Sequence, residues 1–179
     1  ETVARVVVLP DAAQTPEQLP GLAPGIELQS QVARRLAENG CSVIIPATIN
    51  REKLKTDDRR LLASDQTHRE WIYRQAFHMG RHIIGYELQM VLAAVDWFAM
   101  QPGNLKIGVC GSVEGGFVAL HAAALDPRID AALVSAYFDS RQQVWAEPIY
   151  RNVWSRLREF GDAELAGLIL PWDLVIENS

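Results

Sequence analysis

The sequence predicts an α/β protein built on a doubly wound, mostly parallel β-sheet of about five strands. Five short β-rich runs cover residues 4–9, 42–46, 106–110, 130–136 and 173–177. These runs are largely continuous in apolar residues rather than alternating, which is typical of parallel strands covered on both faces. Helical patterns separate them, and strand–helix–strand alternation with right-handed crossovers places helices on both sides of such a sheet.

Four helical patterns lie between these strands, with apolar residues three to four positions apart. They cover residues 27–39, 82–99, 116–125 and 159–170. Each is followed by a residue that stops helices, namely Gly40, Pro102, Pro127 and Pro171. Residues 10–25 and 138–154 would be loops beyond the carboxyl ends of strands, where open α/β sheets place their sites. Residues 48–65, rich in Lys, Arg and Asp, are expected to form a solvated surface segment.

Composition and charge limit the classes of function. The chain has 179 residues, of which 49% are hydrophobic and 22% charged, which is the balance of one globular domain. Its net charge of −5 and its lack of a basic run argue against a nucleic-acid partner, and no apolar stretch reaches membrane-spanning length. We expect a single domain over residues 1–179 that is truncated at both ends, because strands lie directly beside Glu1 and Ser179. These features assign neither a localisation nor an oligomeric state.

The most informative motif is the run Lys-Ile-Gly-Val-Cys-Gly-Ser-Val-Glu-Gly-Gly at residues 106–116. An apolar strand leads into a glycine turn, and a helix begins directly after it. This is the frame of a nucleophile elbow, G-x-S-x-G, in which a strained turn holds a nucleophile clear of the sheet. Gly111 and Gly115 are its two glycines, and Val113 occupies the nucleophile position. Valine cannot attack a carbonyl, and a β-branched residue is strained where the turn demands positive φ.

Together with two later segments, this motif gives the chain a resemblance to a known family. Residues 125–135 resemble the next helix-to-strand step of α/β-hydrolases of the dienelactone hydrolase and acetyl xylan esterase type. Residues 162–177 resemble that family's approach to the strand before the catalytic acid. The resemblance implies an α/β-hydrolase core, an esterase-like ancestry, no cofactor, and a small-molecule ester or carbohydrate ester as the ligand.

The resemblance also implies a strand order and a site. The five strands would correspond to the third through seventh strands of the family sheet, in the spatial order second, first, third, fourth, fifth. The order reverses between the first and third strands, so the crevice would lie between Pro10, Asp11 and Ala12 and the turn at Gly111 to Glu114. The N–H of Glu114 would be an oxyanion donor. Its carboxylate is most simply a favourable contact with the helix dipole.

Three departures from the family pattern argue against ordinary serine hydrolysis. Val113 replaces the serine or cysteine nucleophile. Pro10 and Asp11 follow the first strand, where the family usually has a glycine-rich oxyanion loop. The acid and the histidine would both lie beyond Ser179, so the chain as given is expected to hold no complete triad.

Ser112 is the alternative nucleophile, and an active carboxylic ester hydrolase that uses it remains open. In the hydrolase frame its side chain faces away from the oxyanion donors, which argues against this hypothesis. Cys41 and Cys110 lie at strand edges and are expected to be buried thiols rather than nucleophiles or a disulfide.

Metal and phosphate sites are disfavoured. His78 and His82 are four residues apart and could share a helix face, but they lack the glutamate of H-E-x-x-H and a third ligand, so we expect no metal. The glycine turn lacks both G-x-G-x-x-G and the Walker lysine, which disfavours phosphate. His68 and His121 have no local partner at catalytic spacing, and His121 is expected to pack within its helix.

Residues 147–154 follow the fourth strand, where hydrolases often build a pocket wall. Tyr150 and Arg151 are candidates to line a cleft or bind a carboxylate, and packing of a short helix on the core explains them equally well. The sequence thus predicts an incomplete α/β-hydrolase domain, esterase-like and without ordinary serine hydrolase activity. An active esterase based on Ser112, and a non-catalytic binding module of flavodoxin-like topology, are the alternatives.

Overall fold

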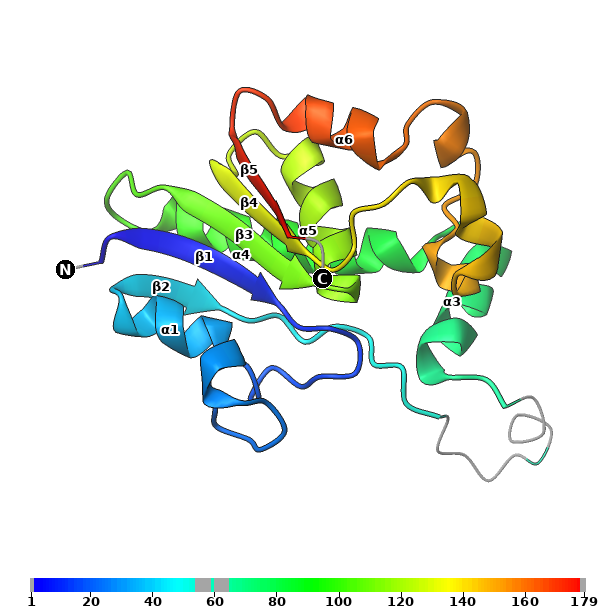
Figure 1. Ribbon diagram of the computed structural model, residues 1–179, viewed down its shortest axis with the longest axis horizontal. Coiled ribbons are helices and arrows are strands. Elements are labelled where there is room, and N and C mark those ends of the chain that lie inside the picture. The colour runs from blue at the N-terminus through cyan, green and yellow to red at the C-terminus, as the bar shows by residue number, and fades with distance from the viewer. Residues whose placement is uncertain (1, 54–58, 60–64, 178–179) are drawn as a thin grey trace.

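The computed structural model describes residues 2–53, 59 and 65–177 and contains a five-stranded parallel sheet. Its strands are β1 (Ala4–Leu9), β2 (Cys41–Ile44), β3 (Ile107–Ser112), β4 (Ala131–Ser135) and β5 (Asp173–Glu177). Their spatial order is β2-β1-β3-β4-β5, and every neighbouring pair is parallel (Figure 1). The predicted fold class and strand order are confirmed. Because the order reverses between β1 and β3, the carboxyl ends of these two strands flank the crevice.

Helices cover both faces of this sheet (Figure 1). The α-helices are α1 (Val32–Glu38), α3 (His68–His78), α4 (Ile83–Met100), α5 (Glu114–Leu125) and α6 (Asp162–Ile169). Short 3-10 turns are η1 (Leu28–Ser30), η2 (Arg141–Ala146), η3 (Ile149–Arg151) and η4 (Arg156–Arg158). α1 packs on β1 and β2 from one side, whereas α4 and α5 pack on the other side and α6 packs against α5 and β5.

Several helix bounds differ from the sequence prediction. The helix expected at 27–39 begins as the 3-10 turn η1, and its α-helical part starts only at Val32. α5 begins at Glu114 rather than at residue 116. The helical patterns read from the sequence do not include α3, because its buried residues are Arg69, Tyr73 and Ala76, which give a weak apolar stripe.

His78 and His82 do not share a helix face. His78 is the last residue of α3, whereas His82 is the N-cap of α4 and accepts a hydrogen bond from Ile84 N through Nδ1. Gly80, with φ of 67°, lies in the turn that separates the two helices. Within the part of the chain that the structure describes, no group of three His, Cys, Asp or Glu side chains is placed to hold a metal ion. The expectation that no metal binds stays a prediction.

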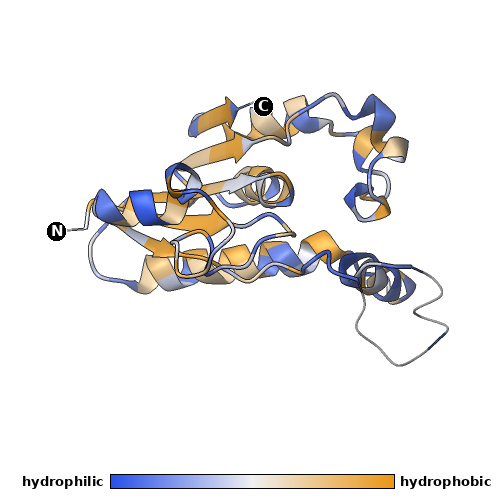
Figure 2. Cartoon of the chain, turned by 60° about the horizontal axis from the view of Figure 1, so that its bottom comes forward, coloured by the Kyte–Doolittle hydropathy of each residue, from blue (hydrophilic) through white to orange (hydrophobic). Residues whose placement is uncertain are grey.

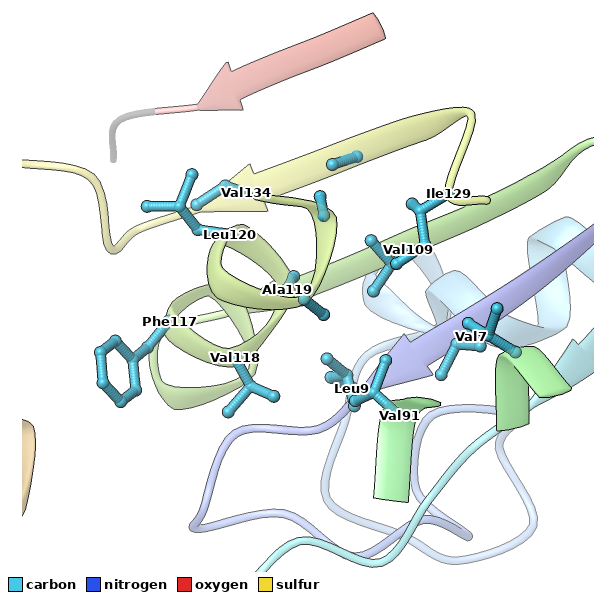
Figure 3. Packing of buried hydrophobic residues seen from close by; sticks show 14 of the residues in the cluster. Val7, Leu9, Val91, Val109, Phe117, Val118, Ala119, Leu120, Ile129 and Val134 are labelled. Carbon is cyan, nitrogen blue, oxygen red and sulfur yellow. The ribbon is translucent and has the colours of Figure 1, made fainter. Parts of the chain in front are cut away.

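Alternate strand residues point to the two faces of the sheet and build two hydrophobic clusters. Toward α4 and α5, Val7 of β1 and Val109 of β3 belong to the larger cluster, in which Val118 of α5 lies beside Leu9 (Figure 3). Toward α1, Val8 and Cys110 form a second, smaller cluster. Each fully buried aliphatic side chain contributes roughly 1.5–3 kcal/mol to stability, so the larger cluster carries most of the driving force for this fold. Figure 2 shows strands that are mainly hydrophobic and helices in which hydrophobic and hydrophilic residues are mixed.

β5 is an exposed edge strand, contrary to the prediction that the strands are covered on both faces. Leu174 is partly buried and packs against the larger cluster. Val175, however, is 52% exposed and Ile176 is 37% exposed. Since β5 makes its contacts mainly with β4 and α6, its apolar side chains stay largely open.

α4 corrects the prediction that no apolar stretch reaches membrane-spanning length. Its 18 residues have a mean hydropathy of 1.3, so the helix is long and apolar enough to cross a bilayer by length and composition. Its buried face carries Val91, Val95 and Phe98 into the larger hydrophobic cluster, and it contacts β1, α3 and α5. This packing is that of a core helix.

Candidate functional site

β3 and α5 meet in a sharp turn at Val113. This residue is the N-cap of α5, with φ of 52° and ψ of −112°. Its N–H donates to Ser135 O at 3.0 Å, and its own carbonyl accepts from Phe117 N at 3.0 Å. A bulky β-branched residue at positive φ stores on the order of 1–3 kcal/mol of strain, which the surrounding packing must offset. The predicted apex at residue 113 is confirmed, and its positive φ shows that the turn is strained rather than relaxed, which the sequence left open.

Gly111 and Gly115 allow the strand, turn and helix to approach closely. A Cβ on Gly111 would lie 2.3 Å from the carbonyl carbon of Gly115, and a Cβ on Gly115 would lie 2.3 Å from Leu9 O. These neighbours are backbone atoms, so they cannot move aside cheaply. Neither glycine has positive φ, which Val113 adopts instead. The two glycines are therefore required for close contact rather than for an unusual backbone conformation.

We expect Gly111→Ala to destabilise the fold by about 1–3 kcal/mol or more, because the added methyl group overlaps the backbone of Gly115. Gly167→Ala is the matched control. Gly167 lies inside α6 with nothing within 4 Å of the new Cβ, so this change should raise stability by about 0.5–1 kcal/mol. Urea unfolding of both variants measures the difference. Equal effects of the two substitutions would contradict the close contact at the turn.

The Asp11 side chain occupies the crevice between β1 and β3. Asp11 follows β1 and is 8% exposed. Its Oδ1 accepts hydrogen bonds from Glu114 N at 3.3 Å and from Arg51 Nη2 at 2.9 Å, and its Oδ2 accepts from Ala13 N at 3.0 Å. The N–H that the hydrolase frame assigns to the oxyanion therefore already binds an anion. A substrate oxyanion would have to displace this carboxylate.

The Glu114 carboxylate lies at the centre of a buried ion-pair cluster, so it is more than the helix-dipole contact that the sequence suggested. Its side chain is 1% exposed, and its Oε1 accepts from Arg151 Nε at 2.7 Å. Its Oε2 pairs with Arg51 Nη2. Burial lowers the pKa of Arg151, but the hydrogen bond and charge of Glu114 outweigh this effect and raise that pKa. Arg151 thus does bind a carboxylate, and that carboxylate is internal.

Arg51 corrects the prediction that residues 48–65 form a solvated segment. Residues 54–58 and 60–64 of that segment lie outside the described part of the chain. The Arg51 side chain is 34% exposed and joins Asp11 to Glu114. Its backbone N–H also donates to Ala12 O at 2.9 Å. The signal that could have found it is its place in the segment that follows β2, because β2 lies beside β1 and segments after parallel strands start at the carboxyl edge of the sheet.

The ion-pair cluster extends from the elbow to α6. Arg151 Nη1 pairs with Glu147 at 3.2 Å, and Glu147 also pairs with Arg141. Arg141 Nε donates to Asp162 Oδ2 at 2.7 Å. Opposite charges alternate along this cluster, so each buried charge is compensated by a partner. The segment between β4 and α6 is thereby joined to Glu114 at the start of α5.

Tyr150 packs in the core. It is 6% exposed and forms a small hydrophobic cluster with Tyr73 and Ile83. The Arg69 guanidinium lies 4.8 Å from the centre of its ring. Arg69 itself is fully buried and donates to Glu87, with Nη2 at 2.7 Å from Oε2. The sequence left open whether residues 147–154 line a cleft or pack on the core, and Tyr150 packs on the core.

Ser112 lines a cavity of about 610 Å³ on the face of the sheet that α1 covers, together with Cys110 and Leu36. No hydrogen bond joins its hydroxyl to a histidine or a carboxylate within residues 2–53, 59 and 65–177. Burial raises the pKa of the Cys110 thiol to about 12, which makes it unreactive. Cys110 and the half-buried Cys41 are free thiols, as predicted.

His121 is packed within α5, as the sequence suggested. Its ring contacts Phe117 with 4.5 Å between centroids, and its Nδ1 lies 2.7 Å from Phe117 O. Arg156 Nη1 lies 2.9 Å from its Nε2. Because arginine only donates, Nε2 accepts and Nδ1 must carry the proton. Burial lowers the pKa of His121 to about 4, and the charge of Arg156 acts in the same direction, so the imidazole is neutral.

We expect His121 to destabilise the fold as the pH falls from about 6.5 to about 4. In this window the unfolded chain binds a proton that the folded protein does not, so the free energy of unfolding decreases by up to roughly 3 kcal/mol. Below about pH 4 both states bind the proton and this loss ends. Thermal unfolding of the parent and of His121→Gln across this range measures the difference. Parallel curves would contradict a neutral buried imidazole.

A sequence model of the dienelactone hydrolase family matches residues 17–150, which include the elbow, Asp11's partner Arg51 and most of the ion-pair cluster. The chain belongs to the dienelactone hydrolase family. The predicted resemblance is confirmed. No protein of reviewed function matches the chain in sequence.

Solved structures support the same fold for this dienelactone hydrolase family member. A protein named as an acetyl xylan esterase, from Bacteroides fragilis NCTC 9343, aligns with a TM-score of 0.73 and 16% identity over 98% of this chain and 52% of its own. A CE15 esterase from a marine bacterial metagenome aligns with a TM-score of 0.55 and 15% identity over 99% and 56%. A cold-adapted esterase from an Arctic intertidal metagenomic library gives 0.51 and 17% over 98% and 60%. The chain thus spans about half the length of the first of these structures.

Proposed function

We propose that this domain keeps the backbone of a nucleophile elbow but does not carry out ordinary serine hydrolysis there. Val113 at the apex is the observation that carries the proposal. Its φ of 52° is the conformation that presents a nucleophile in the hydrolase frame, yet its side chain has no attacking atom. The strained turn is therefore present, but the residue at its apex has no nucleophilic group.

The surroundings of Val113 support the same proposal. Asp11 accepts the hydrogen bond of Glu114 N, so a second negative charge at this N–H would be repelled. Both ring nitrogens of the buried His121 are engaged by Phe117 and Arg156, so it offers no free base. A small-molecule ester or carbohydrate ester remains the ligand class that the family suggests, to be bound rather than cleaved.

Hydrolysis of p-nitrophenyl acetate together with labelling by a fluorophosphonate tests the proposal. We expect the unmodified chain to release p-nitrophenol no faster than an unrelated protein of similar surface, and to take up no label. A working serine hydrolase accelerates its reaction at least 10⁶-fold, so the two outcomes are well separated. Saturable turnover with label on Ser112 would overturn the proposal and favour the alternative nucleophile.

A further inference from the structure

Arg69 lies in the first turn of α3 and is fully buried, although it carries a charge. Its guanidinium pairs with Glu87 of α4 through both terminal nitrogens, and Nη2 lies 2.7 Å from Glu87 Oε2. Burial lowers the pKa of Arg69, but the hydrogen bonds and the charge of Glu87 outweigh this effect and raise that pKa. A buried ion pair is by itself weak evidence for stability, because the desolvation of two charges offsets much of their attraction. The other contacts of the pair therefore indicate what it contributes.

The Arg69–Glu87 pair holds both backbone polar groups of Ile49. Arg69 Nη1 donates to Ile49 O at 2.9 Å, and Ile49 N donates to Glu87 Oε1 at 3.2 Å. Ile49 lies in the segment after β2, and two residues of extended chain span at most about 7 Å. The pair therefore limits where Arg51, two residues later, can place its backbone.

The residues that follow Arg51 are tied to the start of α3 as well. His68 N donates to Glu52 O at 2.7 Å. Lys53 forms an isolated antiparallel bridge with Thr67, the N-cap of α3. The backbone on both sides of Arg51 is thus held by the start of α3.

Arg69 also contacts the residue beside Arg151. Its guanidinium carbon lies 4.8 Å from the centre of the Tyr150 ring. Tyr150 is buried and directly precedes Arg151, whose Nε donates to Glu114 Oε1 at 2.7 Å. Arg69 therefore contacts the chain within two residues of both arginines that pair with Glu114.

We propose that Arg69 is a positioning residue for the elbow, because it sets the places of Arg51 and Arg151. These two arginines pair with the Glu114 carboxylate, and Arg51 also pairs with Asp11, which accepts from Glu114 N. Loss of the Arg69 contacts should release Asp11 and free the N–H that the hydrolase frame assigns to an oxyanion. The importance of a blocked N–H rests on the proposed function, whereas the contacts that keep it blocked can be measured without reference to turnover.

Hydrogen exchange of the Glu114 amide, followed by NMR, tests this proposal. The main variant is Arg69→Met together with Glu87→Leu, because replacing a buried ion pair by apolar residues of similar volume is often neutral for stability. Exchange at Glu114 should become at least about tenfold faster than in the unmodified chain, whereas the amides of β3 should exchange as before. A purely structural role predicts unchanged protection at Glu114 once the fold is intact.

Arg69→Lys is a second variant, which keeps a positive charge beside Glu87. Lysine lacks the planar fork that binds Glu87 and Ile49 together and contacts the Tyr150 ring. Exchange at Glu114 should therefore again become faster, by at least about threefold. This variant does not leave the Glu87 carboxylate buried without a cation.

Arg34→Met together with Glu38→Leu is the matched control, because it makes the same substitutions in an ion pair whose side chains are 46% and 59% exposed. It should leave exchange at Glu114 within about twofold of the parent. Unchanged exchange at Glu114 in a folded Arg69 variant would overturn the proposal. Equally faster exchange in β3, or failure of both Arg69 variants to fold, would also overturn it, since Arg69 would then support the whole fold.

Ester turnover by the unmodified chain would overturn the proposed function and leave these exchange rates as expected. Unchanged exchange at Glu114 in the Arg69 variants would overturn the positioning role and leave the absence of turnover as expected. The two proposals therefore fail by different measurements.

Discussion

Glu114→Ala should lower the free energy of unfolding by about 3–5 kcal/mol. The substitution removes a 1% exposed carboxylate and leaves Arg51 and Arg151 without their shared partner. Arg151 would keep its 3.2 Å contact with Glu147 and Arg51 would keep Asp11, but Glu114 would no longer offset the desolvation of either guanidinium. The loss should reach beyond the elbow, since Arg151 is also the link to Glu147. Chemical unfolding followed by circular dichroism gives the magnitude.

Two control variants separate the effect of burying the ion pair from the effect of losing one charge. Glu38→Ala breaks an ion pair with Arg34 whose side chains are 59% and 46% exposed, so it should cost less than about 1 kcal/mol. Glu114→Gln keeps the volume and one hydrogen-bond acceptor but removes the charge, so its effect should fall between the other two. Equal losses from Glu114→Ala and Glu38→Ala would show that the cluster around Glu114 is not buried in solution.

The sheet could be predicted because its signals are local. The strands follow from local buried runs, and their order follows from the family resemblance. The turn at Val113 follows from glycines four residues apart, on each of which a Cβ would lie 2.3 Å from a backbone atom. The edge position of β5 was not predicted, because an apolar run looks the same whether or not another element covers it. α3 was missed for a related reason, since its most buried side chain, Arg69, is charged.

The contents of the crevice could be predicted only in part. Asp11 and Glu114 were assigned to it from topology, but the contact between them joins positions 103 residues apart. Arg51, which pairs with both, lies in a stretch whose composition is that of a solvated surface. The sequence does not show which charged residues pair with one another, so ion-pair clusters of this kind can be identified only in the folded structure. The packing of Tyr150 on Arg69 could not be predicted for the same reason, because the two residues are far apart in the sequence.

Val113→Ser should not restore ester turnover. The introduced hydroxyl would occupy the apex, but a serine needs a base to take its proton and a donor to stabilise the oxyanion. Within the described residues, His121 is held by Phe117 and Arg156, and His82 Nδ1 accepts from Ile84 N at 3.2 Å. The donor at Glu114 N is held by Asp11. Both requirements are therefore unmet, and p-nitrophenyl acetate should be hydrolysed no faster than by the parent chain.

Adding Asp11→Gly to Val113→Ser tests which requirement limits the chemistry. This second change frees Glu114 N while the base stays absent, so a fluorophosphonate should label the double variant faster than the single variant, with turnover still missing. One oxyanion donor is worth about 10²–10³-fold in rate, which sets the size of the difference. Ser112→Ala in the double variant is the control, and it should leave the labelling unchanged. Equal labelling of the single and double variants would show that Asp11 does not obstruct the donor, and turnover by the single variant would show that a base reaches the apex after all.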